Sequence, residues 1–361
     1  MKNILHYIIL SILIVLAACV KKDHFGPTDM KEIKAFTLEE QVGTTIIDNV
    51  RREIKITVAQ DAYLQQLKTA KIELASFASI KPALGEAQDF TQPVTYTVIA
   101  EDGSTLAYKV IVTREGGNPQ VFNADFNKWY EAETFGNKYT DIGESDKDLT
   151  WGTGNKGAAL LGQTPTRPLP NGVGNFAAEM TTTDMGSLAA FLGKRTAAGS
   201  LFTGYLDASS IVNAAPVFGI PFRATPDSFR VRYSYAPGAP VMDGKGKTVA
   251  GLKDSCDIYV LLENRVYNPG DTVVKRLGTA WFRSGDVQAD WKTLQLPIRY
   301  GQLPAGTPAY MLPQGRNERW GDPAKDKVTH VTVVFTSSAR GNDYIGAWGS
   351  QLIVDDFQLL Y

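Results

Sequence analysis

Cysteine and histidine are both scarce in this chain of 361 residues. It holds two cysteines, Cys19 and Cys256, and three histidines. Two cysteines cannot supply a disulfide framework or a cysteine-based zinc site. If the N-terminus is processed, His330 is the one histidine left in the folded part. This excludes most histidine-dependent metal sites, and a Ser-His-Asp triad could use only His330.

The chain also lacks an excess of charge of either sign. Its 37 Lys and Arg residues balance 38 Asp and Glu residues, which gives a formal net charge of −1. Because binding to a phosphate backbone needs a basic excess, nothing points to a nucleic-acid partner. Glycine (33 residues) and aromatic side chains (16 Phe, 15 Tyr and 6 Trp) are abundant instead, a balance typical of turn-rich β proteins.

The apolar segment near the N-terminus, 8–15, is too short to span a bilayer as a permanent helix. Leu-Ala-Ala-Cys follows it and ends at Cys19. This sequence resembles the lipobox of bacterial lipoproteins, which implies that Cys19 becomes the lipidated first residue of the mature chain. An ordinary secretory signal with an incidental cysteine is the alternative. We expect a signal peptide over 1–19, a tether over 20–30, and an outer-membrane lipoprotein of the cell envelope that faces the periplasm or the surface.

Two β domains are predicted after the tether. Alternating apolar residues indicate a small β domain over 31–115, in which Asp102-Gly103 lies between two alternating segments and predicts a hairpin with a type I′ turn. Residues 116–120 contain Gly-Gly and Pro, which break strands, so we expect a linker there. The rest of the chain, 121–361, is predicted to form one larger all-β domain.

The larger domain is predicted to consist of two packed antiparallel sheets. Apolar alternation favours strands, and Gly, Pro and Asn clusters separate them. The strands are expected at 228–235, 257–263, 277–282, 291–297, 328–336 and 351–360. The fold class is therefore all-β, with a jelly roll or similar sandwich behind a smaller β domain.

The small domain resembles a known type of module. Residues 96–113 resemble the last hairpin of the immunoglobulin-like β-sandwiches found near the N-terminus of Bacteroidetes surface lipoproteins. The resemblance implies a spacer that presents the domain after it. A small β domain with a ligand of its own is the alternative.

The larger domain carries an ordered series of short motifs. They lie at 122–129, 149–155, 219–226, 232–238, 257–259, 336–338 and 349–357. The series resembles the PCMD domain, the putative carbohydrate metabolism domain of Bacteroidetes lipoproteins, and covers 121–361. This resemblance implies a jelly roll similar to carbohydrate-binding modules and a glycan context, but no particular reaction.

Aromatic residues in polar loops are the candidates for contacting a sugar. Sugar rings present apolar C–H faces, so a glycan site needs exposed flat aromatics beside amides, Arg or carboxylates. Trp320 lies near Arg316, and Trp151 lies near Asn155, in two such loops. Arg223, in a Pro-bounded loop, is a further candidate. The alternative for both tryptophans is burial against the sandwich.

The remaining aromatic residues lie in apolar patterns. Tyr235 is included among the ligand-binding candidates, although it shares a strand face with Tyr233 and Val231 and fits a core or cross-strand pair better. The other tryptophans are expected in the core: Trp129, Trp281, Trp291 and Trp348.

The last predicted strand places two carboxylates among apolar neighbours. If the strand alternates, Asp355 and Asp356 lie on opposite faces, where an unpaired carboxylate would be costly. A structural Ca²⁺ held by Asp355, Asp356 and Asp125 would remove that cost. The alternative is that these carboxylates pair with backbone N–H groups or an Arg. It is favoured because this chain has Asn127 where members of the resembled family often carry an acidic residue, so a carboxylate that could bind the ion is missing. We expect no other cofactor.

No sequence spacing selects a catalytic site. A glycoside hydrolase needs two carboxylates about 5–5.5 Å or about 6.5–9.5 Å apart. The acids that could serve, besides the last strand's pair, are Glu131, Glu133, Glu179, Asp207 and Glu263.

Three other features favour structural roles. Residues 152–157 match G-x-G-x-x-G but lack the strand and helix of a dinucleotide site. His330 alternates with Val328 and Thr332 in a predicted strand, which favours a structural histidine. Cys256 is expected to be buried and inert.

The sequence favours non-catalytic binding of a polysaccharide or glycoconjugate by a lipid-anchored envelope protein with a role in carbohydrate uptake or metabolism. A glycoside hydrolase is one alternative. An adhesion or assembly protein that binds another envelope protein is the other, and a broad exposed apolar patch would favour it.

Overall fold

The chain forms two compact units, which divide between Gly117 and Asn118. The computed structural model describes residues 26–208, 214–268, 271–315 and 317–361. The division falls inside the predicted linker. Cys19, its signal peptide and the candidate Arg316 lie outside the described residues. Within the described ranges, no helix has both the length and the apolar character needed to cross a membrane.

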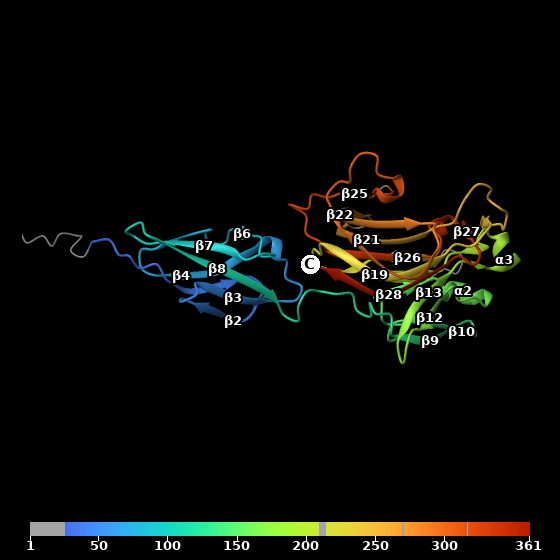
Figure 1. The fold of residues 1–361 in the computed structure, drawn as a ribbon, viewed down its shortest axis with the longest axis horizontal. Helices are drawn as coiled ribbons and strands as arrows, with labels where there is room; N and C mark the ends of the chain where they lie inside the picture. The colour runs from blue at the N-terminus through green and yellow to red at the C-terminus, as the bar shows by residue number, and fades with distance from the viewer. Residues whose placement is uncertain (1–25, 209–213, 269–270, 316) are drawn as a thin grey trace, which may run out of the picture. The chain divides into compact units, whose positions relative to one another are not determined.

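The first unit is a small immunoglobulin-like β-sandwich (Figure 1). Its core holds Phe36, Ile56, Phe90 and Tyr96, which are almost fully buried. One sheet has the order β1 (Ile33–Leu38), β4 (Leu67–Leu74), β6 (Ala87–Gln88). The other has the order β2 (Gln41–Asp48), β3 (Glu53–Val58), β8 (Thr105–Arg114), β7 (Val94–Ile99), β5 (Ser79–Lys81).

The predicted hairpin at Asp102-Gly103 is confirmed, but its turn differs from the expected type. The N–H of Ala100 donates to the carbonyl of Ser104, which leaves a three-residue loop, and φ is positive only at Gly103, at +83°. A type I′ turn needs positive φ at two positions. Asp102 acts instead as a cap, because its carboxylate accepts hydrogen bonds from the N–H and the hydroxyl of Ser104.

The second unit is a larger β-sandwich of the jelly-roll type, built from two main sheets (Figure 1). The nine-stranded sheet follows the path β11 (Trp151–Thr153), β16 (Ser200–Asp207), β26 (His330–Thr336), β21 (Cys256–Asn268), β22 (Asp271–Ser284), β24 (Arg299–Tyr300). Off that path are β17 (Ala215–Phe218), β18 (Ile220–Pro221) and β25 (Glu318–Trp320). The five-stranded sheet has the order β12 (Thr166–Pro170), β13 (Phe176–Thr181), β28 (Gln351–Leu360), β19 (Ser228–Ala236), β23 (Gln288–Pro297).

Short elements surround the two sheets. The two-stranded pairs are β9 (Trp129–Thr134) with β10 (Asn137–Ile142), β14 (Thr183–Asp184) with β15 (Thr196–Ala197), and β20 (Val241–Met242) with β27 (Gly346–Ala347). The helical segments are η1 (Leu64–Gln66) in the first unit and α2 (Asn155–Ala158), η2 (Ala159–Leu161), α3 (Gly186–Phe191), η3 (Ala309–Met311) and η4 (Gly341–Asp343) in the second.

Alternation along each strand decides which residues enter the core of the second unit. On β21, Cys256, Ile258 and Val260 point inward and are fully buried in the core between the sheets. Asp257 and Tyr259 must then project from the outer face of the nine-stranded sheet, because neighbouring residues of a strand point to opposite faces. That outer face is where the candidate site lies.

The C-terminal strand β28 does not alternate as expected. Arg232 pairs with Asp355 and Arg230 with Gln358, so two residues of β28 face the single residue between those arginines, and Asp356 has a φ of +52°. This β-bulge shifts the phase of the strand, so that Val354 and Phe357 both enter the core. The prediction that one aspartate lies on each face is therefore wrong.

Candidate functional site

A groove of about 480 Å³ opens on the outer face of the nine-stranded sheet. Its floor is formed by β21, β22 and β26, and loops from distant parts of the chain form its sides. The volume lies within the roughly 300–1,000 Å³ of small-molecule sites. The groove is therefore large enough to hold a ligand of a few sugar units.

Three aromatic rings contact one another in the lining of the groove. Tyr259 on β21 stands directly opposite Trp281 on β22, and the two rings stack with centroids 3.8 Å apart and planes 18° apart. Tyr310, from η3, contacts Trp281 at a centroid distance of 5.6 Å. The cross-strand pair is thus a rigid aromatic unit in which each ring covers one face of the other, and Tyr310 meets it at an interplanar angle of 61°.

A buried ion pair adjoins the three rings. Arg283, opposite Asp257 in the ladder, donates to both carboxylate oxygens, with an Nε–Oδ1 distance of 2.7 Å. The guanidinium also lies 3.6 Å from the centroid of Tyr310. Burial raises the pKa of Asp257, and the hydrogen bonds and charge of Arg283 oppose that rise. Because both oxygens of Asp257 accept hydrogen bonds from Arg283, this carboxylate acts here as a partner for the guanidinium.

The stacked pair carries two polar atoms, the Nε1 of Trp281 and the phenol oxygen of Tyr259. The Nε1 of Trp281 is buried and makes no hydrogen bond of good geometry, although it lies near enough to Asp257 to contribute to lowering that pKa. Trp281 therefore offers the groove ring carbon and not its N–H. The phenol of Tyr259 makes no hydrogen bond with the described residues, and burial raises its pKa, so it stays protonated at neutral pH.

The groove has two further sides. One is the hairpin of β16 and β17, which contributes Leu206, Pro216 and Phe218. The other is the segment 338–344, which contributes Arg340 and Asp343, with a distance of 3.5 Å between Arg340 Nε and Asp343 Oδ2. The positive charges of the two lining arginines are thus each balanced by a neighbouring aspartate.

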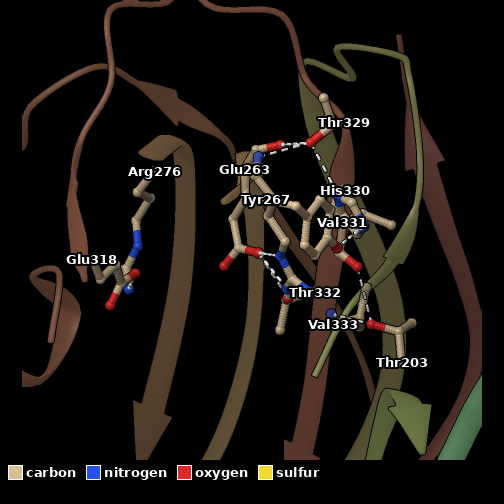
Figure 2. A network of polar contacts seen from close by, with 11 residues as sticks. Thr203, Glu263, Tyr267, Arg276, Glu318, Thr329, His330, Val331, Thr332 and Val333 are labelled. Carbon is tan, nitrogen blue, oxygen red and sulfur yellow. Dashed lines mark hydrogen bonds and ion pairs between the residues drawn. The ribbon is translucent and has the colours of Figure 1, made fainter. Parts of the chain in front are cut away.

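The same sheet face continues beyond the groove as a covered polar network (Figure 2). Glu263 accepts hydrogen bonds from Arg265, with an Nη2–Oε2 distance of 2.6 Å, and Arg276 on β22 pairs with Glu318 on β25. Arg276 also donates to the carbonyl of Met311, at 2.7 Å. These bonds hold the segment that carries Tyr310 onto the sheet, so the network positions one side of the groove.

His330 belongs to this network and has a structural setting. Its Nδ1 lies 2.9 Å from the hydroxyl of Thr329 and its Nε2 lies 3.1 Å from the hydroxyl of Tyr267 (Figure 2). Burial, with a contribution from the charge of Arg265, lowers the pKa of His330 to about 4. The imidazole is therefore neutral at pH 7, and it does not line the groove.

Three predicted sugar-contact residues are buried in the structure, and their prediction as ligand contacts is wrong. Trp151 is 3% exposed and packs against Phe335 in the core, and its Nε1 donates to the carbonyl of Phe122. Asn155 is fully buried, and its side chain bonds to the backbone of Thr166. Tyr235 is 1% exposed, so it belongs to the core as its strand pattern indicated. Polar neighbours in the sequence did not indicate solvent access for Trp151 and Asn155, because the polar groups there form hydrogen bonds inside the fold.

The remaining predicted contacts lie outside the groove. Trp320, at the end of β25, is half-buried and faces the guanidinium of Arg276 at 6.0 Å. Arg223 is exposed in the loop before β19. Neither residue lines the groove, so the structure does not bring the predicted sugar contacts together.

The three carboxylates proposed for calcium have other partners. Asp355 accepts a hydrogen bond from Asn171 at 2.6 Å, and Arg232 lies 3.6 Å from Asp355 and 3.2 Å from Asp356. Asp125 accepts from Asn127. Within the described residues, no group of three His, Cys, Asp or Glu side chains is arranged to hold a metal ion. In the last strand both aspartates therefore lie beside Arg232, which is the alternative of pairing with an arginine.

The groove contains residues that sequence reasoning placed elsewhere. Trp281 was expected in the core, and it lies on the outer face beside Tyr259. Trp291 was also expected in the core and is 37% exposed on β23. Cys256 is buried as expected. One sequence signal could have found the groove. Asp257 and Tyr259 are two residues apart on one strand and Trp281 and Arg283 are two apart on the next, so each pair shares a face of the sheet.

Two family models match the chain. The model described as "Putative carbohydrate metabolism domain" (PCMD) matches residues 125–360, and the model described as "SGBP, N-terminal" matches residues 33–112. The first match covers more than half of the chain. The chain belongs to the PCMD family. This PCMD protein therefore joins a carbohydrate-related sandwich to the β domain before it. No curated protein matches it.

Solved structures resemble this PCMD protein over most of its length. One is a putative glycoside hydrolase from Bacteroides thetaiotaomicron, with 26% identity, a TM-score of 0.53, and coverage of 94% of this chain and 98% of that one. Another is a putative glycoside hydrolase from Bacteroides vulgatus, with 24% identity, a TM-score of 0.52, and coverage of 65% of this chain and 96% of that one. The second likeness shows the fold alone.

Proposed function

We propose that the larger domain binds a glycan in the groove and does not cleave it. The observation that carries this proposal is the stacked pair of Tyr259 and Trp281, extended by Tyr310, on the floor of a groove. The C–H groups of sugar rings pack favourably against the carbon of aromatic side chains, and a rigid pair loses little conformational freedom when it binds. The family match to a carbohydrate-related domain supports the same ligand class.

The carboxylates of the groove argue against hydrolysis. Asp257 and Asp343 are the acidic residues that line it among the described residues, and each faces an arginine. An acid–base pair needs one carboxyl that can deliver a proton and another that is free to act as base or nucleophile. Asp257 is buried with both oxygens bonded to Arg283. The acids considered from sequence, such as Glu179 and Glu263, do not line the groove.

A binding assay with a matched control tests this proposal. The full chain is screened against a glycan array, and each hit is titrated against the Tyr310→Ala and Trp291→Ala variants. We expect Tyr310→Ala to weaken binding about tenfold or more, because a stacking ring is lost from the groove. Trp291→Ala removes a ring of the same class from the opposite sheet and is expected to leave affinity unchanged.

Two results would contradict the proposal. One is a set of glycans that bind the wild type and the Tyr310→Ala variant equally well. The other is the release of new reducing ends from a bound polysaccharide by the wild type but not by an Asp257→Asn variant, since that result would make the groove an enzyme active site.

We further propose that the protein is presented from the cell envelope by a lipid on Cys19. The Leu-Ala-Ala-Cys sequence supports this proposal. Metabolic labelling with an alkyne-tagged fatty acid is expected to label the wild type and not a Cys19→Ser variant, and fractionation is expected to place the labelled chain in the outer membrane. Equal labelling of both proteins would rule out Cys19 as the lipid attachment site.

A further inference from the structure

The two long sides of the groove have different chemistry. The side that carries Tyr310 and Arg283 presents an aromatic ring, a guanidinium and, beyond them, the side chain of Gln314, whose Nε2 donates to the carbonyls of Ala309 and Leu312. The opposite side is the hairpin of β16 and β17. Of the five hairpin residues that line the groove, four are apolar and only Ser200, at the start of β16, is polar: Ser200, Phe202, Leu206, Pro216 and Phe218.

Strand pairing aligns these apolar side chains on one face of the hairpin. Leu206 pairs with Pro216 and Gly204 with Phe218, and strand alternation turns Val217 to the other face. Phe202 and Phe218 meet edge to face, with centroids 5.0 Å apart. The pairing register of β16 with β17 therefore decides which side chains line the groove. We call the groove-facing side of this hairpin the hairpin wall, and a shift of the register by one residue would turn the other set of side chains toward the groove.

The wall is open to the groove and is not sealed core. Leu206, Pro216 and Phe218 are only partly buried, while Phe202 and Val334 behind them are 3% and 5% exposed. A sugar hydroxyl pressed against this wall would lose its hydration and gain no hydrogen bond, which is unfavourable. An alkyl group in the same place would gain from leaving water.

We propose that this hairpin wall is a subsite for a methyl group carried by the bound sugar. Two kinds of sugar supply such a group: an N-acetylated sugar, through its acetamido methyl, and a 6-deoxy sugar, through its C6 methyl. The proposal rests on the proposed function and makes it more specific. The sugar ring lies against Tyr259, Trp281 and Tyr310 while its methyl group faces Leu206 and Phe218.

Matched pairs of sugars test the methyl subsite by isothermal titration calorimetry on the full chain. Chitotetraose is compared with cellotetraose for the acetamido group, and L-fucose is compared with L-galactose and L-rhamnose with L-mannose for the deoxy group. We expect the methyl-bearing member of at least one pair to bind about fourfold tighter or more, which is the gain from burying one methyl-sized group.

Substitutions on the two faces of the hairpin show where the preference arises. Leu206→Asn is expected to reduce the preference to less than twofold, and Pro216→Ser serves as a second variant if the first does not fold. Val217→Asn makes the same kind of change on the face turned away from the groove and is expected to keep the preference. A preference that survives in both groove-facing variants would overturn the proposal.

The outcomes separate this inference from the proposed function. If glycans bind but the members of every pair bind equally, the methyl subsite is wrong and glycan binding stands. If no glycan binds, in these pairs or on the array, the proposed function fails and the methyl subsite fails with it.

Discussion

Two surfaces of the larger domain carry the same three kinds of side chain in different shapes. In the groove, Arg283 stacks on Tyr310 and pairs with Asp257. On the five-stranded sheet, Arg232 lies 4.8 Å from the ring centroid of Trp291 and pairs with Asp355 and Asp356. An aromatic ring, an arginine and a carboxylate are therefore present at both places, and the first set lines the groove described above while the second is not part of it.

This difference shows that enclosure, and not residue type, distinguishes the candidate site. Trp291 stands on a strand of the sheet surface and is 37% exposed. Trp281 shares its groove with segments that lie more than 60 residues away in the sequence, such as the hairpin with Leu206 and Pro216. A ligand gains from contact on several sides, because each side removes more apolar surface from water.

The largest difference between the two surfaces is expected in stability. Arg283→Ala leaves the buried carboxylate of Asp257 without its partner, and we expect it to lower the free energy of unfolding of the larger domain by about 3 kcal/mol. Arg232→Ala, where the arginine side chain is 38% exposed, should cost about 1 kcal/mol or less. Urea denaturation of the full chain measures both values.

A double variant provides the control for that comparison. Adding Asp257→Asn to Arg283→Ala removes the buried charge and should restore part of the lost stability. Equal losses from Arg283→Ala and Arg232→Ala would mean that the groove is no more enclosed than the open sheet.

The next difference is expected in glycan affinity. Trp281→Leu keeps an apolar side chain and removes the indole that stacks on Tyr259, so we expect about tenfold weaker binding of an array hit. Trp291→Leu is expected to leave the affinity within about twofold of the wild type. Calorimetric titrations of the same glycan provide the numbers. A larger loss of affinity from Trp291→Leu than from Trp281→Leu would indicate that the glycan binds on the five-stranded sheet and not in the groove.

A smaller effect is expected when the salt concentration changes. The arginines that line the groove face aspartates, so a groove of balanced charge should bind an uncharged sugar with little dependence on ionic strength. Raising NaCl from about 50 mM to about 500 mM should change the affinity by less than about twofold. A tenfold fall would indicate that the bound glycan is charged.

The last effect is expected only below neutral pH, at the covered end of the same sheet face. The folded pKa of His330 is lowered to about 4 from 6.5, so between these pH values the unfolded chain binds more protons than the folded one. Stability is therefore fully present above pH 6.5 and falls as the pH drops toward 4. His330→Gln should flatten this part of the pH profile in urea denaturation. An unchanged profile would show that His330 does not contribute to it.

The strands could be predicted from sequence because their signal is local. The segment expected at 228–235 is β19, Ser228–Ala236, and the one expected at 351–360 is β28, Gln351–Leu360. Period-two alternation is written into neighbouring residues and needs no knowledge of the rest of the chain. The bulge at Asp356 was missed because the extra residue shows only when β28 is paired with β19.

The groove could not be predicted because its residues give ambiguous local signals. Trp281 lies between Ala280 and Phe282, so the strand is apolar on both faces and the pattern indicates core on both. Tyr310 comes from a loop that is held in place by Arg276 and the carbonyl of Met311, a long-range contact. Trp151 failed for the opposite reason, since its polar surroundings form hydrogen bonds inside the fold.

The bulge in β28 also bears on how related chains should be compared with this one. Asp355 points outward and Phe357 inward, so a chain that lacks only Asp356 would still place every later residue of the strand on the same side. Such a chain would lose one partner of Arg232 and keep the core. An alignment of relatives should therefore allow a one-residue gap at Asp356, because sliding the C-terminal strand by one position would match core residues to surface residues.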